Sequence, residues 1–94
     1  MIFDLHPKAI SRILATEDQQ SCQFSAGRRD QMIGGRRWEL MQIEVNSRWC
    51  EDGVESLTGK LSYHGQSYPA IIRIHHGEGV METTDRPSSR DSNL

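Results

Sequence analysis

Two adjacent glycines, Gly34 and Gly35, separate two runs of strand-like sequence. A tight two-residue turn between antiparallel strands needs positive φ angles, which glycine adopts at low cost. The pair therefore predicts a β-hairpin. No helix start and no Walker-type lysine follows the glycines, so the segment does not have the pattern of a phosphate-binding loop.

Four arginines surround this predicted turn, and only one acid, Asp30, lies among them. Guanidinium groups gathered at a hairpin tip can bind carboxylates or phosphates through two parallel hydrogen bonds. Two observations weaken a nucleic-acid interpretation: no aromatic residue interleaves the arginines, although Trp38 is adjacent, and Glu39 and Glu44 are close enough in sequence to pair with them. The interpretation that we favour for the tip is a solvated or ion-paired face. A contact for an acidic protein ranks second, and a nucleic-acid site ranks third. The four residues are Arg28, Arg29, Arg36 and Arg37.

The size and composition of the chain limit what it can enclose. Its 94 residues and 35% hydrophobic fraction suffice for one modest core, without room for a deep pocket. We therefore expect no enzyme with a sequestered active site, no catalytic residues and no cofactor. The formal net charge of −2 provides no whole-molecule field that would attract nucleic acid.

The cysteines and the first residues favour a cytoplasmic protein. No apolar run approaches the roughly 20 residues that span a bilayer, and the first residues lack the basic and apolar regions of a secretory signal. Cys22 and Cys50 lie in strand-like segments without CxxC spacing. In a reducing compartment we expect two buried thiols, with a disulfide between them as the alternative.

Residues 6–16 carry the clearest helix signal. Pro7 suits the first helical position, and Asp4 or His6 is placed to cap it. The segment before it, which contains Phe3, is expected to form a brief strand or to pack against the helix start. The apolar residues that recur at helical spacing are Ala9, Ile10, Ile13 and Leu14.

From residue 21 onward the apolar residues alternate with polar ones, which is typical of strands. Runs at 21–33, 36–49, 54–63, 67–75 and 80–82 are separated by predicted turns at Gly34-Gly35, Asp52-Gly53, His64-Gly65-Gln66 and the segment between Gly77 and Gly79. In the second run the alternation changes phase between Leu40 and Met41. That change indicates either a β-bulge there or a central strand covered on both faces.

These elements predict a single α+β domain over residues 1–82. We expect one N-terminal amphipathic helix packed on a four- to five-stranded antiparallel β-meander. The alternative is a small SH3-like β-barrel with an appended helix. Residues 83–94 contain no apolar residue before Leu94 and are expected to be a disordered tail.

Three histidines and Glu78 raise the question of a metal site. Adjacent residues of a strand point to opposite faces, so His75 and His76 cannot both face one site unless a turn reorients them. His64 is expected near the other end of the same hairpin, and neither cysteine has metal-type spacing. We predict no metal ligands and keep metal-dependent activity as a second alternative function.

The two tryptophans and one isoleucine complete the candidate residues. Trp38 is expected to start a strand and pack under the helix. Trp49 adjoins a turn, and Ile71 is expected to face away from the core, so both are candidate anchors for a partner.

The functional hypothesis combines these features. We expect a small, non-enzymatic, cytoplasmic interaction or regulatory protein that binds a larger, acidic protein partner, as a monomer or a homodimer, without contact to a membrane. A nucleic-acid-binding protein that uses the same hairpin is the alternative. The predicted partner-binding residues are Arg28, Arg29, Arg36, Arg37, Trp49 and Ile71.

Overall fold

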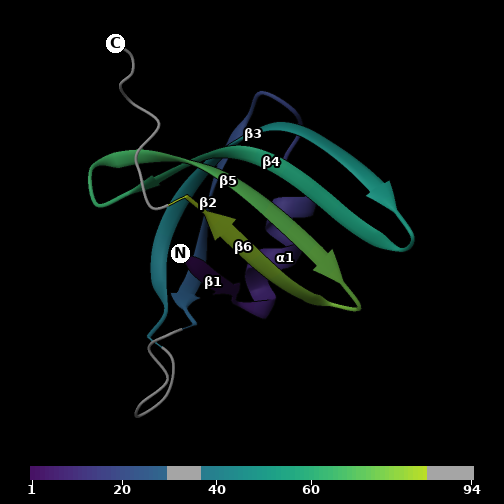
Figure 1. Cartoon of the computed structure of the whole chain (residues 1–94), viewed down its shortest axis with the longest axis horizontal. Coiled ribbons are helices and arrows are strands. Elements are labelled where there is room, and N and C mark those ends of the chain that lie inside the picture. The colour runs from purple at the N-terminus through teal and green to yellow at the C-terminus, as the bar shows by residue number, and fades with distance from the viewer. Residues whose placement is uncertain (30–36, 85–94) are drawn as a thin grey trace.

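The computed structural model describes residues 1–29 and 37–84, which form six antiparallel strands and one helix. Each strand pairs with the next strand in sequence, and the last strand returns to pair with the first, so that the sheet closes into a barrel (Figure 1). In chain order the elements are β1 (Ile2–Leu5), α1 (Pro7–Leu14), β2 (Ser21–Arg28), β3 (Glu39–Glu51), β4 (Val54–Tyr63), β5 (Gln66–His75) and β6 (Glu78–Thr83).

The closed barrel corrects the prediction of a helix on an open meander of four or five strands. The strands do follow each other in meander order, but β1 pairs with β2 on one side and with β6 on the other, which removes both sheet edges there. The alternative interpretation, a small barrel, is the better description. The helix is not an appendage, because Ile10 and Ile13 of α1 belong to the hydrophobic core.

Three two-residue turns connect β3 to β6. In Asp52-Gly53, His64-Gly65 and His76-Gly77 both residues have positive φ, between 52° and 78°. Such turns match the right-handed twist of the flanking strands. The first two turns lie where the sequence predicts them, whereas the third precedes Gly79, which lies inside β6.

The predicted turn at Gly34-Gly35 lies outside the described residues. The strands on its two sides, β2 and β3, are antiparallel neighbours. In an unbroken ladder with a two-residue turn at these glycines, Met41 would lie opposite Arg28. Met41 instead lies opposite Phe24, so the ladder of the described residues is not in register with such a turn.

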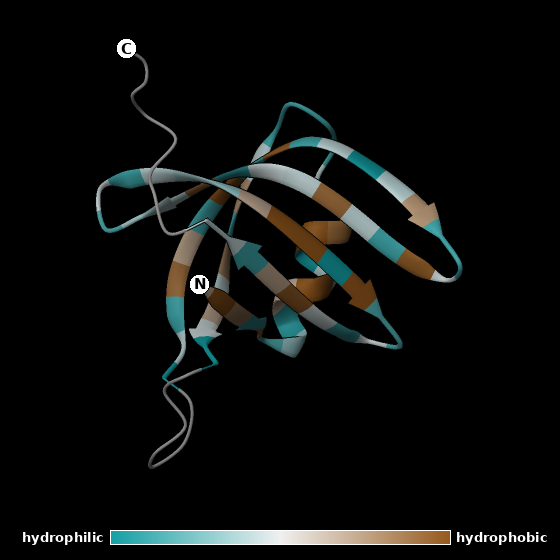
Figure 2. Ribbon diagram, viewed as in Figure 1, coloured by the Kyte–Doolittle hydropathy of each residue, from teal (hydrophilic) through white to brown (hydrophobic). Residues whose placement is uncertain are grey.

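The core fills the barrel interior with alternate side chains from every strand. The ribbon in Figure 2 shows the corresponding change between hydrophobic and hydrophilic residues along the strands. Each fully buried aliphatic or aromatic side chain contributes about 1.5–3 kcal/mol relative to leaving it in water. The largest fully buried side chains of the core are Phe3, Ile13, Ile43, Val45, Leu57, Leu61, Ile72 and Met81.

The helix begins as predicted, with Pro7 at its start and His6 as its cap. The His6 Nδ1 atom accepts a hydrogen bond from the Lys8 backbone N–H at 3.1 Å. Three of the four predicted stripe residues are buried, whereas Leu14 in the last turn remains 38% exposed.

A register shift in β3 determines which side chains of this strand point away from the barrel interior. Met41 and Val45 point into the core, while Leu40 lies on the outside and is 67% exposed. The predicted irregularity at Leu40-Met41 is therefore wrong, and the shift lies between Val45 and Ser47. After it, the inward and outward positions of β3 exchange.

Beyond the shift, Arg48 lies opposite the buried Leu57 and faces the inner side of the sheet. Its Nη1 donates to the carbonyl oxygen of Leu14 at 2.9 Å, and its Nε lies 3.7 Å from the Asp18 carboxylate. A cation at a helix C-terminus is favourable because the last carbonyl groups carry partial negative charge. Arg48 thus fastens the end of α1 to β3.

Cys50 and Trp38 are more exposed than the sequence predicts. Cys22 is half-buried but Cys50 is exposed, and both are free thiols, so the prediction of two buried thiols is wrong for Cys50. Trp38 does not pack under the helix: it is 41% exposed, and its ring lies 4.9 Å from the ring of His6 at the helix start.

Gly59 in β4 is a position where the barrel tolerates no side chain. A Cβ atom there would collide with the backbone carbonyl oxygen of Glu44, which cannot rotate away. We expect Gly59→Ala to lower the free energy of unfolding by about 2 kcal/mol or more, because the strands must separate locally. Urea denaturation measures this loss. The control, Ser62→Ala at an exposed position of β4, should change stability by less than about 0.5 kcal/mol. Equal stability of the two variants would contradict the conclusion that position 59 has no room for a side chain.

Candidate functional site

Arg29, one of the four predicted tip arginines, forms an ion pair with another residue of the chain. Its Nη2 and Nε atoms lie 2.6 and 3.2 Å from Oδ1 of Asp4 in β1. The hydrogen bond and the negative charge of Asp4 raise the pKa of Arg29. The Arg29 charge is therefore balanced by a residue of the neighbouring strand.

Arg28 belongs to a second charged group at one mouth of the barrel. Its side chain forms a hydrogen bond with Tyr63, whose ring packs edge-on against Phe3 at 5.3 Å between centroids. Burial raises the pKa of Tyr63 and nearby Glu39 raises it further, while Arg28 acts in the opposite direction. His64 Nε2 lies 3.5 Å from Oε1 of Glu39.

In the described part of the chain, the predicted arginines therefore have separate contacts and do not form one cluster. Arg28 contacts Tyr63, Arg29 contacts Asp4, and Arg37 is exposed. Arg36 lies outside the described residues. A prediction from sequence spacing alone misses this division because Asp4 is far from Arg29 along the chain.

The other two predicted residues, Trp49 and Ile71, lie on one outer face of the sheet. Trp49 pairs with Ser56 of β4, and Ile71 pairs with Thr58, two positions further along the same strand. Paired residues share a face, and so do positions two apart, so all four side chains point outward. Strand spacing and rise place the Trp49 and Ile71 Cα atoms about 12 Å apart.

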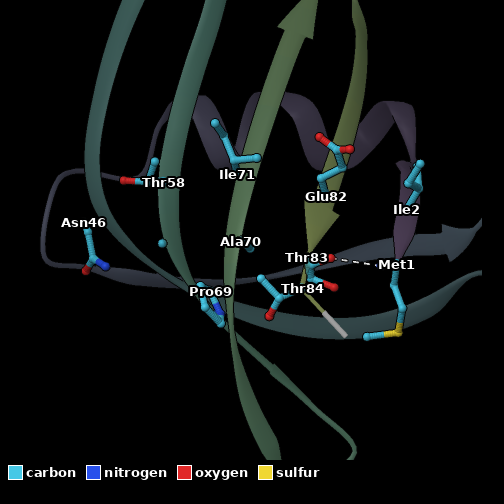
Figure 3. A pocket seen from close by; sticks show the side chains of 11 residues that line it. Met1, Ile2, Asn46, Thr58, Pro69, Ala70, Ile71, Glu82, Thr83 and Thr84 are labelled. Carbon is cyan, nitrogen blue, oxygen red and sulfur yellow. Dashed lines mark hydrogen bonds between the residues drawn. The ribbon is translucent and has the colours of Figure 1, made fainter. Parts of the chain in front are cut away.

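The row through Ile71 continues across the barrel closure. Thr58, Ile71, Glu82 and Ile2 lie side by side on β4, β5, β6 and β1, with α1 on the far side of the sheet (Figure 3). Ile2 and Glu82 are members of this face that sequence reasoning missed. The β5–β6 pairing places Glu82 beside Ile71, and the pairing of β1 with β6 is needed to add Ile2 to the row.

An open groove of about 690 Å³ runs along this face. Its apolar part includes Ile2, Pro69, Ala70 and Ile71, and polar groups from Asn46, Thr58 and Glu82 border it. At one end the amino group of Met1 donates a hydrogen bond to the Thr83 carbonyl oxygen at 2.9 Å (Figure 3). A mostly apolar groove with a polar border is typical of a recognition surface.

Charge on this face is locally balanced. Arg73 Nη1 lies 3.2 Å from Oε1 of Glu82, and both side chains are about half exposed. The face therefore presents apolar side chains with a neutral ion pair beside them, without a strong field of either sign.

The histidines do not converge. His64 lies at the β4–β5 turn, and His75 and His76 lie at the β5–β6 turn, at the opposite end of β5. Among residues 1–29 and 37–84, no group of three or more histidine, cysteine, aspartate or glutamate side chains is arranged to hold a metal ion.

Comparison of the chain with protein-family models, with curated proteins and with solved structures gave no match. Within the same two described ranges, no helix is long and apolar enough to cross a membrane.

The environment of Tyr63 predicts an alkaline effect on stability. Because its pKa is raised above the ordinary 10.0, the unfolded chain releases this proton at lower pH than the folded protein. The stabilising contribution is complete below pH 10 and is lost as the pH rises through the raised pKa. We expect Tyr63→Phe to remove this part of the alkaline loss, as measured by urea denaturation at increasing pH.

Phenolate absorbance tests the cause of the shift. Tyr68→Phe removes the only other tyrosine, so that the Tyr63 titration can be followed alone. In that background Glu39→Gln should lower the Tyr63 midpoint, because it removes a negative charge that opposes ionisation. An unchanged midpoint would show that Glu39 does not act on Tyr63.

Proposed function

We propose that this protein is a small non-enzymatic interaction domain that binds a protein partner through the outer face formed by Trp49, Ile71, Pro69 and Ile2. The observation that carries the proposal is the common orientation of Trp49 and Ile71, about 12 Å apart, beside an apolar groove. The partner expected from this chemistry presents an apolar side chain to the groove and an apolar or aromatic one to Trp49.

The energetics of docking support this choice of surface. Trp49 is 42% exposed and Ile2 is 39% exposed, so both have apolar area still to bury. Tryptophan is enriched among residues that dominate binding energy, and truncation of such residues typically costs 2 kcal/mol or more. The polar border and the Arg73–Glu82 pair suit the rim of an interface rather than its centre.

The arginines have a secondary role in this proposal. Arg37 is the exposed cation on the β3 side, suited to steer an acidic partner, whereas Arg29 already has a carboxylate partner in Asp4. Exposed charges mainly change association rates and their dependence on salt. When an apolar segment of the partner docks on this face, the protein would sterically mask that segment.

Nucleic-acid binding is the weaker candidate. It requires cations free to neutralise phosphates, and the Arg29–Asp4 pair together with the net charge of −2 opposes that requirement. Binding to generic RNA or DNA that weakens steeply with salt, and less steeply after Arg37→Ala, would favour this candidate over the protein partner.

A photoreactive amino acid at position 71 tests the proposed face in cells. The expected result is a crosslink to a defined protein, obtained from position 71 and not from position 23, an exposed site on β2 outside this face. The crosslinked protein is then purified and its dissociation constant for the chain is measured by calorimetry.

Variants decide whether the face carries that binding. We expect Ile71→Glu and Trp49→Ala each to raise the dissociation constant by about 30-fold, which corresponds to about 2 kcal/mol. Gln23→Glu adds the same charge on another side of the barrel and should leave the constant unchanged. Binding that survives both face variants would refute this assignment of the surface.

A further inference from the structure

Among residues 1–29 and 37–84, no second strand pairs with the latter half of β3, which therefore forms a sheet edge. β2 pairs with β3 only as far as Glu44, and residues 19 and 20 extend the contact to Val45. Within the part of the chain that the structure describes, the backbone of residues 47–51 has β4 as its only strand neighbour. Figure 1 shows β3 as the outermost strand where the β3–β4 hairpin extends beyond the barrel.

The alternation of the β3–β4 ladder determines which groups this edge offers. The two-residue turn at Asp52-Gly53 makes Glu51 and Val54 a hydrogen-bonded pair, and such pairs alternate along antiparallel strands. Trp49 and Glu51 therefore direct their backbone groups toward β4. Arg48 and Cys50 direct their N–H and C=O groups outward, toward the open edge.

The usual protection of an exposed edge is weak here. Natural edges are often guarded by lysine, proline or a charged side chain. Residues 47–51 contain no lysine and no proline. Their one cation, Arg48, reaches under the sheet to the Leu14 carbonyl and Asp18, and their one acid, Glu51, lies at the end of the segment, next to the turn. Trp49 and Cys50, which are exposed, remain at the centre of the edge.

We propose that this edge pairs with the same edge of a second copy of the chain, in an antiparallel two-fold arrangement centred on Trp49. In that register Arg48 and Cys50 of one copy exchange their outward N–H and C=O groups with Cys50 and Arg48 of the other. The outward groups thus match in both directions, as a symmetric interface requires.

The side chains also suit this register. Trp49 lies opposite Trp49 of the second copy in a non-hydrogen-bonded pair, where Cα atoms are about 4.5 Å apart and aromatic pairs are stabilising. Arg48 lies opposite Cys50, and Ser47 lies opposite Glu51, so no like charges face each other. A two-fold pair centred on Arg48 would instead oppose two arginines, which is destabilising.

This pairing would join the outer faces of two barrels into one continuous face, with both tryptophans at its centre. A two-fold contact uses both copies' edges, so the assembly stops at a dimer. The dimer does not depend on the partner proposed above, because the edge shares only Trp49 with the proposed partner-binding face and shares no residue with the groove.

Sedimentation velocity over a wide protein concentration range, under reducing conditions, tests the dimer. Cys50→Pro removes an outward N–H and blocks strand addition, while it leaves the β4 ladder intact because that N–H does not point to β4. We expect the dimer dissociation constant to rise about tenfold or more, whereas Cys50→Ser should dimerise like the natural chain. Circular dichroism confirms that Cys50→Pro is folded, and Trp49→Thr provides a second variant of the same edge with its backbone groups intact.

Disulfide trapping tests the register. In a Cys22→Ser, Cys50→Ser background, Trp49→Cys should crosslink two copies under mild oxidation, and Ser47→Cys should not. With the natural sequence, Cys50 and its counterpart would be about 8 Å apart, beyond the reach of a relaxed disulfide. A monomer at all concentrations, a dimer unaffected by Cys50→Pro, or crosslinking at Cys50 but not at position 49 would overturn the proposal. A variant that no longer dimerises but still binds the partner through the groove would show that the dimer and the proposed function are independent.

Discussion

The pairing of β1 with β6 is the constraint on which the rest of the structure depends. It joins residues 2–4 to residues 80–82, nearly the full length of the described chain, and closes the sheet on itself. Closure places Phe3 and Met81 side by side in the core, with no exposed area. It also places Ile2 beside the groove, while the pairing of β1 with β2 on its other side places Asp4 beside Arg29. Both the apolar face and the neutralisation of Arg29 therefore depend on the short strand β1, which pairs with β6 on one side and with β2 on the other.

Local signals in the sequence were sufficient for most elements. Pro7 and the apolar stripe predicted α1, and the glycines at 53 and 65 predicted two tight turns, because each signal acts within a few residues. The barrel itself was not predictable in the same way. β1 has four residues, too few for a periodic signal, and its partners are far away in sequence. The number of strands and the closure depend on this non-local pairing.

The candidate residues show the same limit. Outward orientation of Ile71 followed from simple alternation along β5, and the described register agrees with it. Trp49 was chosen for its position beside a turn, and its place on the same face as Ile71 depends on the register shift in β3. The arginines appeared to be one cluster because only sequence neighbours were visible. Their actual contacts, Asp4 and Tyr63, come from other strands.

The shift between Val45 and Ser47 has a consequence for how such a surface can arise or disappear. If the same residues followed strict alternation after Val45, without the shift that accommodates Asn46, Trp49 would face the core and Arg48 would face water. Because Val45 and Ser47 already pair with the adjacent residues Gly59 and Thr58, deletion of Asn46 would remove the irregularity and leave Arg48 inside and Trp49 outside. The character of this end of the molecule therefore depends on the shift, which gives β3 room for one residue more than β4 and so places Trp49 in water and Arg48 beneath the sheet.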